Sequence, residues 1–150
     1  MRKHAILSAS GAHRWLNCPP SARLEQQFED EPSEYAAEGT AAHALAEDTL
    51  RAWFDPDYPT DKDLGIRDKE MIEHVKRYTE IVMEKLRPKA ELFIEQRLDF
   101  SPWVPEGFGT GDAVIVSDDV LEIIDLKYGK GVQVSAENNP QLRLYALGAY

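Results

Sequence analysis

The stretch GTGDAVIVSDDVLEIIDLK, residues 109–127, decides the fold of this chain. Residues 110–116 and 120–126 are rich in β-branched and apolar side chains, which favours two strands. The segment between them, residues 117–119, is Ser-Asp-Asp and has the composition of a turn. We therefore expect an antiparallel hairpin here.

A two-residue loop of Asp118 and Asp119 determines which residues of this hairpin face each other. It places Asp112 directly opposite Asp125, with Cβ atoms about 4.5–5.5 Å apart on one face. Lys127 shares that face with Asp125, because side chains alternate along a strand. Facing carboxylates repel each other unless a cation lies between them. The pattern therefore predicts a metal site with oxygen ligands, which suit Mg²⁺ or Mn²⁺.

Length and composition are those of a single globular domain over residues 1–150, with 43% apolar and 29% charged residues. No apolar run approaches the ~20 residues that span a bilayer, so we expect no membrane partner. The apolar stretch near the N-terminus is too short for a secretory signal. The single cysteine, Cys18, excludes an internal disulfide and favours a cytoplasmic location.

The net charge of −10 argues against a nucleic-acid partner, but this charge is unevenly distributed. Residues 1–28 carry a net charge of +3 and residues 126–150 one of +2, so the acidic excess lies between them. Part of this excess is the solvated run EDEPSE, residues 29–34, and a bound divalent cation would neutralise another part. Total charge governs non-specific attraction and not the chemistry of a local site.

Two amphipathic helices are expected over residues 40–54 and 68–86, the first preceded by an acidic loop. The first helix has a buried stripe at helical spacing: Ala42, Leu45, Ala46, Thr49, Leu50 and Trp53. The second has an equivalent stripe: Met71, Ile72, Val75, Tyr78, Val82 and Leu86. Alternation over residues 91–100 predicts a further strand, with Ile94 and Leu98 on one face.

Several polar side chains beside these stripes have two interpretations each. His43, on the flank of the first stripe, is either a hydrogen-bonded packing residue or a metal ligand. Glu47, one turn later, points further out, and we expect it to be solvated, as is His74. Glu95, on the other face of its strand, either joins the carboxylate cluster or pairs at the sheet edge.

The N-terminal residues 7–28 suggest two short helices, with Trp15 and Leu16 turned inward and Ser21 as the cap of the second. Cys18, between these helices, is expected to be a small buried hydrophobic residue. The alternative role, a redox or cluster ligand, requires partners that this chain does not contain.

A basic loop and a final helix follow the hairpin. Lys130 lies in a glycine-containing loop that is suited to approach a phosphate backbone. Asn139 and Pro140 begin the helix as N-cap and first residue, and Gln141 and Tyr145 lie one turn apart on one face. The helix runs to the last residue without a stop signal, so we expect the chain to be truncated at its C-terminus.

Two carboxylates and a lysine on adjacent strands provide what metal-dependent phosphodiester hydrolysis requires. A cation held by Asp112 and Asp125 polarises the scissile phosphate, and Lys127 holds the attacking water or offsets transition-state charge. The alternative is structural: Asp112 caps a turn, and Asp125 and Lys127 form an ordinary cross-strand ion pair.

Four motifs follow one another along the chain: GTAAHALAE with His43, GTGD with Asp112, IIDLK with Asp125-Leu126-Lys127, and QLRLY with Gln141 and Tyr145. Together they resemble the motifs of PD-(D/E)XK nucleases of the RecB-like branch, which includes CRISPR adaptation nucleases and uncharacterised phage-encoded relatives. The opening SASGAHRWLNCP is similar to the start of members in which the cysteine is the first iron–sulfur ligand.

This resemblance implies an α/β (α+β) fold with a restriction-endonuclease-like core, in which helices flank a central mixed sheet that contains the antiparallel hairpin. It implies that four groups bind Mg²⁺ or Mn²⁺: His43, Asp112, Asp125 and the backbone carbonyl of Leu126. It makes Lys127 catalytic, while Gln141 and Tyr145 position DNA or brace the site. Cys18 binds an iron–sulfur cluster only in a longer chain, because the later cysteines of such a cluster are absent here.

The implied function is that of a Mg²⁺-dependent deoxyribonuclease, an exonuclease acting on DNA ends or single strands in phage or bacterial recombination or repair. A recombination protein is an expected partner. Two other functions stay open: a catalytically silent DNA-binding scaffold of the same fold, and an acidic interaction protein that mimics DNA. The mimic requires carboxylates spread along one face, whereas Asp112 and Asp125 lie within apolar strands.

Overall fold

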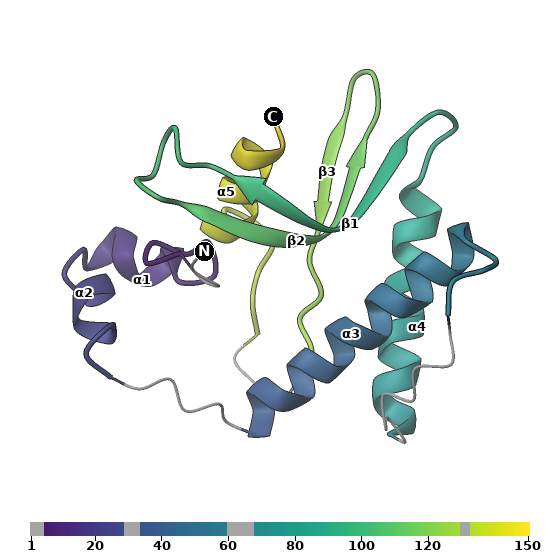
Figure 1. The fold of residues 1–150 in the computed structure, drawn as a ribbon, viewed down its shortest axis with the longest axis horizontal. Helices are drawn as coiled ribbons and strands as arrows, with labels where there is room; N and C mark the ends of the chain where they lie inside the picture. The colour runs from purple at the N-terminus through teal and green to yellow at the C-terminus, as the bar shows by residue number, and fades with distance from the viewer. Residues whose placement is uncertain (1–4, 29–33, 60–67, 130–132) are drawn as a thin grey trace.

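The computed structural model describes residues 5–28, 34–59, 68–129 and 133–150 (Figure 1). Their elements follow in the order α1 (Ala12–Asn17), α2 (Ser21–Glu25), α3 (Glu34–Phe54), α4 (Lys69–Lys85), β1 (Glu91–Asp99), β2 (Phe108–Val116), β3 (Leu121–Ile124) and α5 (Pro140–Ala149). Within these residues, every helix is too short or too polar to cross a membrane.

The three strands form a sheet in the order β1-β2-β3. β2 and β3 are joined by the predicted tight turn and pair in the predicted register, in which Ala113 lies opposite Ile124. β3 ends at Ile124, and the same register continued by one residue places Asp112 opposite Asp125. The hairpin prediction is therefore confirmed.

The expected mixed sheet is wrong for the described part of the chain, where both strand pairs are antiparallel. A parallel pair needs a long crossover connection. The three strands instead follow one another directly, without a helix between them. The coarser prediction, an α+β fold in which helices flank a sheet, is confirmed.

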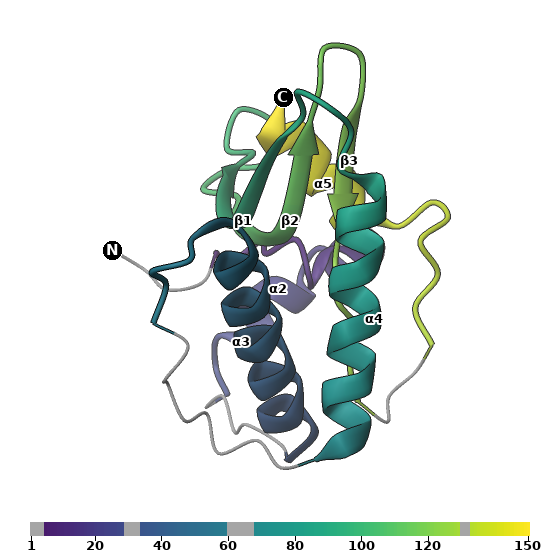
Figure 2. The ribbon, with the colours of Figure 1, turned by 90° about the vertical axis from the view of Figure 1, so that its right-hand side faces the viewer.

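α3 and α4 pack side by side against one face of the sheet (Figure 2). The buried residues on this face form what we call the α3–α4 cluster: Ala42, Ala46, Leu50, Met71, Val75, Tyr78, Val82, Ala113, Ile115 and Leu126. Ala42 and Ala46 are the buried residues of α3 nearest to His43, and their short side chains allow a close approach to the sheet. This close approach brings His43 near β2.

α5 and the N-terminal segment cover the opposite face (Figure 1). The buried residues here form what we call the α5 cluster: Ala9, Ala12, Leu98, Phe100, Val104, Val114, Leu144 and Tyr145. The start of α5 is set by Asn139, whose Oδ1 accepts the N–H groups of Gln141 at 2.9 Å and Leu142 at 3.2 Å. The predicted N-cap is thus confirmed, and it orients Gln141 toward the hairpin.

β1 changes face at Glu95. On a regular strand Ile94 and Leu98 share a face, as the sequence predicted. In the structure Ile94 packs against the α3–α4 cluster, whereas Leu98 belongs to the α5 cluster on the opposite face. Glu95 has a φ of 51°, in the left-handed region. Glu95 and Asp112 are not paired, although the residues on either side of them are, so the β1–β2 ladder is interrupted at this point. This break turns the Glu95 side chain toward α3.

Three predictions about the helices are wrong: where α3 begins, and the burial of one residue in each predicted stripe. α3 begins at Glu34, inside the expected acidic loop, because alanines and glutamates after it favour a helix; residues 29–33 lie outside the described residues. Trp53 is 63% exposed and Ile72 is 45% exposed, although both belong to predicted buried stripes. Each lies where neither the sheet nor the neighbouring helix covers the stripe.

The N-terminal helices also differ from expectation. Cys18 is exposed and not buried, because it lies in the turn that ends α1. Leu16 is 56% exposed, whereas Trp15 is half-buried and its Nε1 donates to the carbonyl of Ser8 at 2.8 Å. Ser21 is the first residue of α2 and its side chain makes no cap hydrogen bond.

Gly109 on β2 lies against the ring of Tyr145 from α5, and a Cβ added at position 109 would lie 2.6 Å from Tyr145 Cε1. We expect Gly109→Ala to reduce the free energy of unfolding by about 1–3 kcal/mol, measured by urea denaturation, because the core is overpacked. Gly39→Ala is the matched control, since a Cβ there meets only the Tyr128 carbonyl at 3.8 Å. Equal stability of Gly109→Ala and wild type would contradict this close packing.

Candidate metal centre

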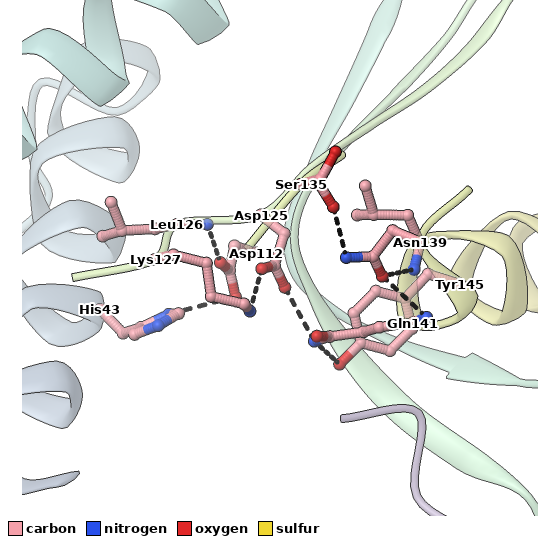
Figure 3. Close-up of polar contacts among 10 residues, drawn as sticks. His43, Asp112, Asp125, Leu126, Lys127, Ser135, Asn139, Gln141 and Tyr145 are labelled. Carbon is pink, nitrogen blue, oxygen red and sulfur yellow. Dashed lines mark hydrogen bonds and ion pairs between the residues drawn. The ribbon is translucent and has the colours of Figure 1, made fainter. Parts of the chain in front are cut away.

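The structure brings His43 of α3 together with Asp112 of β2 (Figure 3). The His43 Nδ1 atom lies 3.2 Å from Asp112 Oδ1. The other oxygen, Asp112 Oδ2, accepts the backbone N–H of Leu126 at 2.6 Å. Asp112 is buried, so both contacts fix the orientation of a carboxylate that has little access to water.

Glu95 is the third member of this group. One ligand atom each of His43, Glu95 and Asp112 lies within 4.8 Å of the other two. The three side chains come from α3, β1 and β2, and the change of face at Glu95 is what places its carboxylate on the α3 side. Of its two interpretations from sequence, the structure thus supports a place in the carboxylate cluster.

Asp125 lies beside this group but has other partners (Figure 3). Its Oδ2 forms an ion pair with Lys127 Nζ, and its Oδ1 accepts a hydrogen bond from Gln141 Nε2 at 3.1 Å. The ligand set implied by the resemblance contained Asp125 and the Leu126 carbonyl. The group of side chains that converges in the structure contains Glu95 together with His43 and Asp112, and the Leu126 N–H donates to Asp112.

Gln141 and Tyr145 act on the site through Asp125. Gln141 Nε2 also lies 3.2 Å from the Tyr145 hydroxyl, so the α5 pair forms a chain of contacts that ends at the Asp125 carboxylate. Of the two predicted roles, positioning DNA or bracing the site, these contacts match bracing. Lys130, the predicted phosphate contact, lies outside the described residues.

A small polar cavity opens beside Lys127, with a volume of about 260 Å³. Side chains from α3, α4 and the segment after β3 line it: Glu38, Asp68, Glu70, His74, Leu126 and Tyr128. His74 is exposed as predicted. Lys127 also lines this cavity, and its side chain is 47% exposed.

The surroundings raise the pKa of three side chains in this region. Burial, and then the charges of Asp112 and Glu47, raise the pKa of Glu95 from 4.5 to about 7. The hydrogen bond to Asp112 raises the pKa of His43, although burial opposes it. Burial, followed by the charge of Asp112, raises the pKa of Asp125 despite the opposing Lys127. In the absence of a cation, the surrounding groups therefore do not fully stabilise the negative charges of these carboxylates.

Glu95→Gln is expected to remove part of the pH dependence of stability of the metal-free protein. Because Glu95 is easier to protonate in the folded chain, stability falls as pH rises from about 4.5 to about 7. The full shift corresponds to about 3 kcal/mol, which partial exposure reduces to about 1–2 kcal/mol. The variant should therefore be more stable than wild type at pH 8 and equal to it at pH 4, by urea denaturation with chelator present. If the variant and wild type differed in free energy of unfolding by the same amount at pH 4 and pH 8, the raised pKa of Glu95 would be contradicted.

The donor set fits a divalent cation. It consists of one imidazole nitrogen and two carboxylate oxygens, which suits Mn²⁺ and, for the carboxylates, Mg²⁺. A cation between Glu95 and Asp112 would offset the repulsion that raises the pKa of Glu95. Protonated His43 cannot act as a ligand, so cation binding has to compete with protons at this site.

Sequence analysis missed the role of two residues on α3. Glu47 is not simply solvated, because its Oε1 accepts from Arg51 Nε at 2.8 Å. Arg51 in turn reaches β1, where its Nη2 donates to the carbonyl of Ile94 at 3.2 Å. The available signal was the four-residue spacing of His43, Glu47 and Arg51, which places them along one side of the helix.

Residues 4–150 match the family described as Protein of unknown function (DUF2800). The chain belongs to this family. The DUF2800 match covers all the elements described above, including the three strands and the helices that carry the candidate metal centre. No solved structure matches the DUF2800 chain.

Proposed function

We propose that this DUF2800 protein is a metal-dependent deoxyribonuclease built on a restriction-endonuclease-like core. The observation that carries the proposal is the convergence of His43, Glu95 and Asp112 from three separate elements. Beside them lie a lysine ammonium and a second aspartate, Lys127 and Asp125, in direct contact. These groups provide both a cation site and a positive charge next to it.

The proposed cofactor is Mg²⁺ or Mn²⁺, held by His43, Glu95 and Asp112. When bound, the cation supplies Lewis-acid polarisation of the scissile phosphate and a nucleophile at neutral pH. Lys127 stabilises negative charge on the phosphate and is itself positioned by Asp125. Gln141 keeps Asp125 in that orientation through its 3.1 Å hydrogen bond.

The proposed substrate is DNA, at ends or in single strands, in recombination or repair of phage or bacterial type, in the cytoplasm and together with a recombination protein. Lys127 lines an open cavity and its side chain is 47% exposed, so a substrate group can reach it without passing through the core. The net charge of −10 disfavours non-specific attraction of DNA, so recognition has to depend on local contacts at the site.

The experiment incubates end-labelled and internally labelled single- and double-stranded DNA with the protein and Mn²⁺, and with Mn²⁺ plus excess chelator. We expect Mn²⁺-dependent cleavage by wild type and strongly reduced cleavage by Asp125→Ala, in which Lys127 loses its partner. Asp119→Asn, in the exposed β2–β3 turn, is the control and should cleave like wild type. Cleavage by Asp125→Ala at the wild-type rate would point to a contaminating nuclease and would overturn the proposal.

A second candidate is a catalytically silent DNA-binding scaffold that keeps the cation. The observation that favours it is the orientation of Asp125 toward Lys127 and Gln141, outside the three-donor group. If the protein is such a scaffold, wild type and all variants should leave the labelled DNA uncleaved while still binding it. The acidic DNA mimic has less support, because Asp112 is buried and Glu95 and Asp125 are half-buried.

A further inference from the structure

Arg51 connects the helix that carries His43 to the strand that carries Glu95. Its Nε donates to Glu47 Oε1 at 2.8 Å, one turn back on α3, and its Nη2 donates to the carbonyl of Ile94 at 3.2 Å. The first contact fixes the plane of the guanidinium, since Arg presents its donors in a rigid fork. The second contact therefore acts on the β1 backbone from a defined direction.

The accepting carbonyl belongs to the peptide unit immediately before Glu95. A peptide unit is planar, so the Ile94 carbonyl and the Glu95 N–H move together. Rotation of this plane about the N–Cα bond of Glu95 is the φ angle of Glu95, which is 51°. A hydrogen bond to the Ile94 carbonyl therefore restricts the φ angle of Glu95 directly.

This φ angle needs support from the surrounding structure. The left-handed region costs a non-glycine residue about 1–3 kcal/mol, so the surrounding structure has to offset this strain. The Glu95 carboxylate is half-buried, and one of its oxygens lies within 4.8 Å of donor atoms of both His43 and Asp112. Backbone strain therefore favours a regular strand conformation at Glu95 unless another contact holds the left-handed turn.

We propose that Arg51 is a positioning residue that holds the β1 backbone in the left-handed turn at Glu95 and so keeps the Glu95 carboxylate in the cation site. The inference rests on the cation site of the proposed function, but not on DNA cleavage. Under this proposal, Arg51 affects cation binding only by positioning Glu95. The proposal therefore predicts that substitutions of Arg51 and Glu95 have non-additive effects on cation affinity.

The experiment is a double-mutant cycle with Mn²⁺ alone as the probe. Mn²⁺ affinity is measured by calorimetry for wild type, Arg51→Met, Glu95→Gln and the double variant, with unfolding measured in chelator for each. Methionine keeps an apolar stem of similar length but cannot donate to Ile94. We expect Arg51→Met to weaken Mn²⁺ binding by about 10-fold or more, as removal of a group that orients a ligand does, and to have no further effect in the Glu95→Gln background.

Arg77→Met is the matched control, because the ion pairs of Arg77 with described residues lie on the surface of α4, with Glu80 and Glu84. It should bind Mn²⁺ like wild type. Arg51→Lys, which keeps the charge but not the fork, should weaken binding nearly as much as Arg51→Met. An equal loss of affinity in both backgrounds, or no loss with Arg51→Met, would overturn the proposal. Because DNA is absent, these outcomes are separate from failure of the nuclease proposal.

Discussion

Lys127→Ala is expected to reduce Mn²⁺-dependent DNA cleavage by about 10²–10³-fold, the usual effect of removing one group that stabilises transition-state charge. The same change should not weaken Mn²⁺ binding. Lys127 contacts Asp125 and not the three-donor group, and loss of a positive charge near that group favours a cation. The measurements are single-turnover cleavage of end-labelled DNA and calorimetric titration with Mn²⁺.

The control for this prediction is Lys76→Ala. Lys76 is an exposed lysine of α4, with a single ion pair to Glu80 at 3.9 Å on the helix surface. Such pairs contribute little, so cleavage and stability should match wild type. If Lys127→Ala cleaved DNA at the rate of Lys76→Ala, the ion pair of Lys127 with Asp125, two residues back on the same segment, would be structural.

Asp112→Asn is expected to abolish the stabilisation of the protein by Mn²⁺. Free Mn²⁺ at 100 times its dissociation constant should stabilise wild type by about 2.7 kcal/mol, which corresponds to a rise in Tm of about 5–10 °C. Asp112 supplies one of the two carboxylates of the site. The amide oxygen of asparagine can still accept the Leu126 N–H, so the metal-free fold should persist.

Thermal unfolding of Asp112→Asn with chelator and with a series of Mn²⁺ concentrations measures this effect. Asp118→Asn, at an exposed position of the β2–β3 turn, is the control and should keep the full rise in Tm. A rise in Tm that is equal in wild type and Asp112→Asn would mean that Mn²⁺ binds elsewhere, and would remove the basis of the proposed function.

The hairpin could be predicted because its information is local. The Asp118-Asp119 loop sets the register, and the register alone places Asp112 opposite Asp125. The N-cap at Asn139 is local in the same sense, since its side chain bonds the next two backbone N–H groups of its own helix. Neither feature depends on what packs against it.

Burial at the surface of the fold was less predictable. Cys18 and Trp53 have residue types that are commonly buried, yet both are exposed. Their exposure depends on whether another element covers them, and helical spacing contains no such information. For the strands that the structure describes, the expected mixed sheet was wrong for a related reason, because sequence patterns identify strands but not their partners.

The sequence by itself determined the hairpin, the helices and the residue types of a candidate cation site, because these follow from spacing along one segment. Only the tertiary structure decided which donors converge. Regular alternation turns Glu95 away from Ile94, whereas the left-handed φ of 51° brings its carboxylate to His43 and Asp112. That angle is supported by Arg51, forty-three residues away from the Ile94 carbonyl that it binds. A strand pattern cannot encode a contact made by another element.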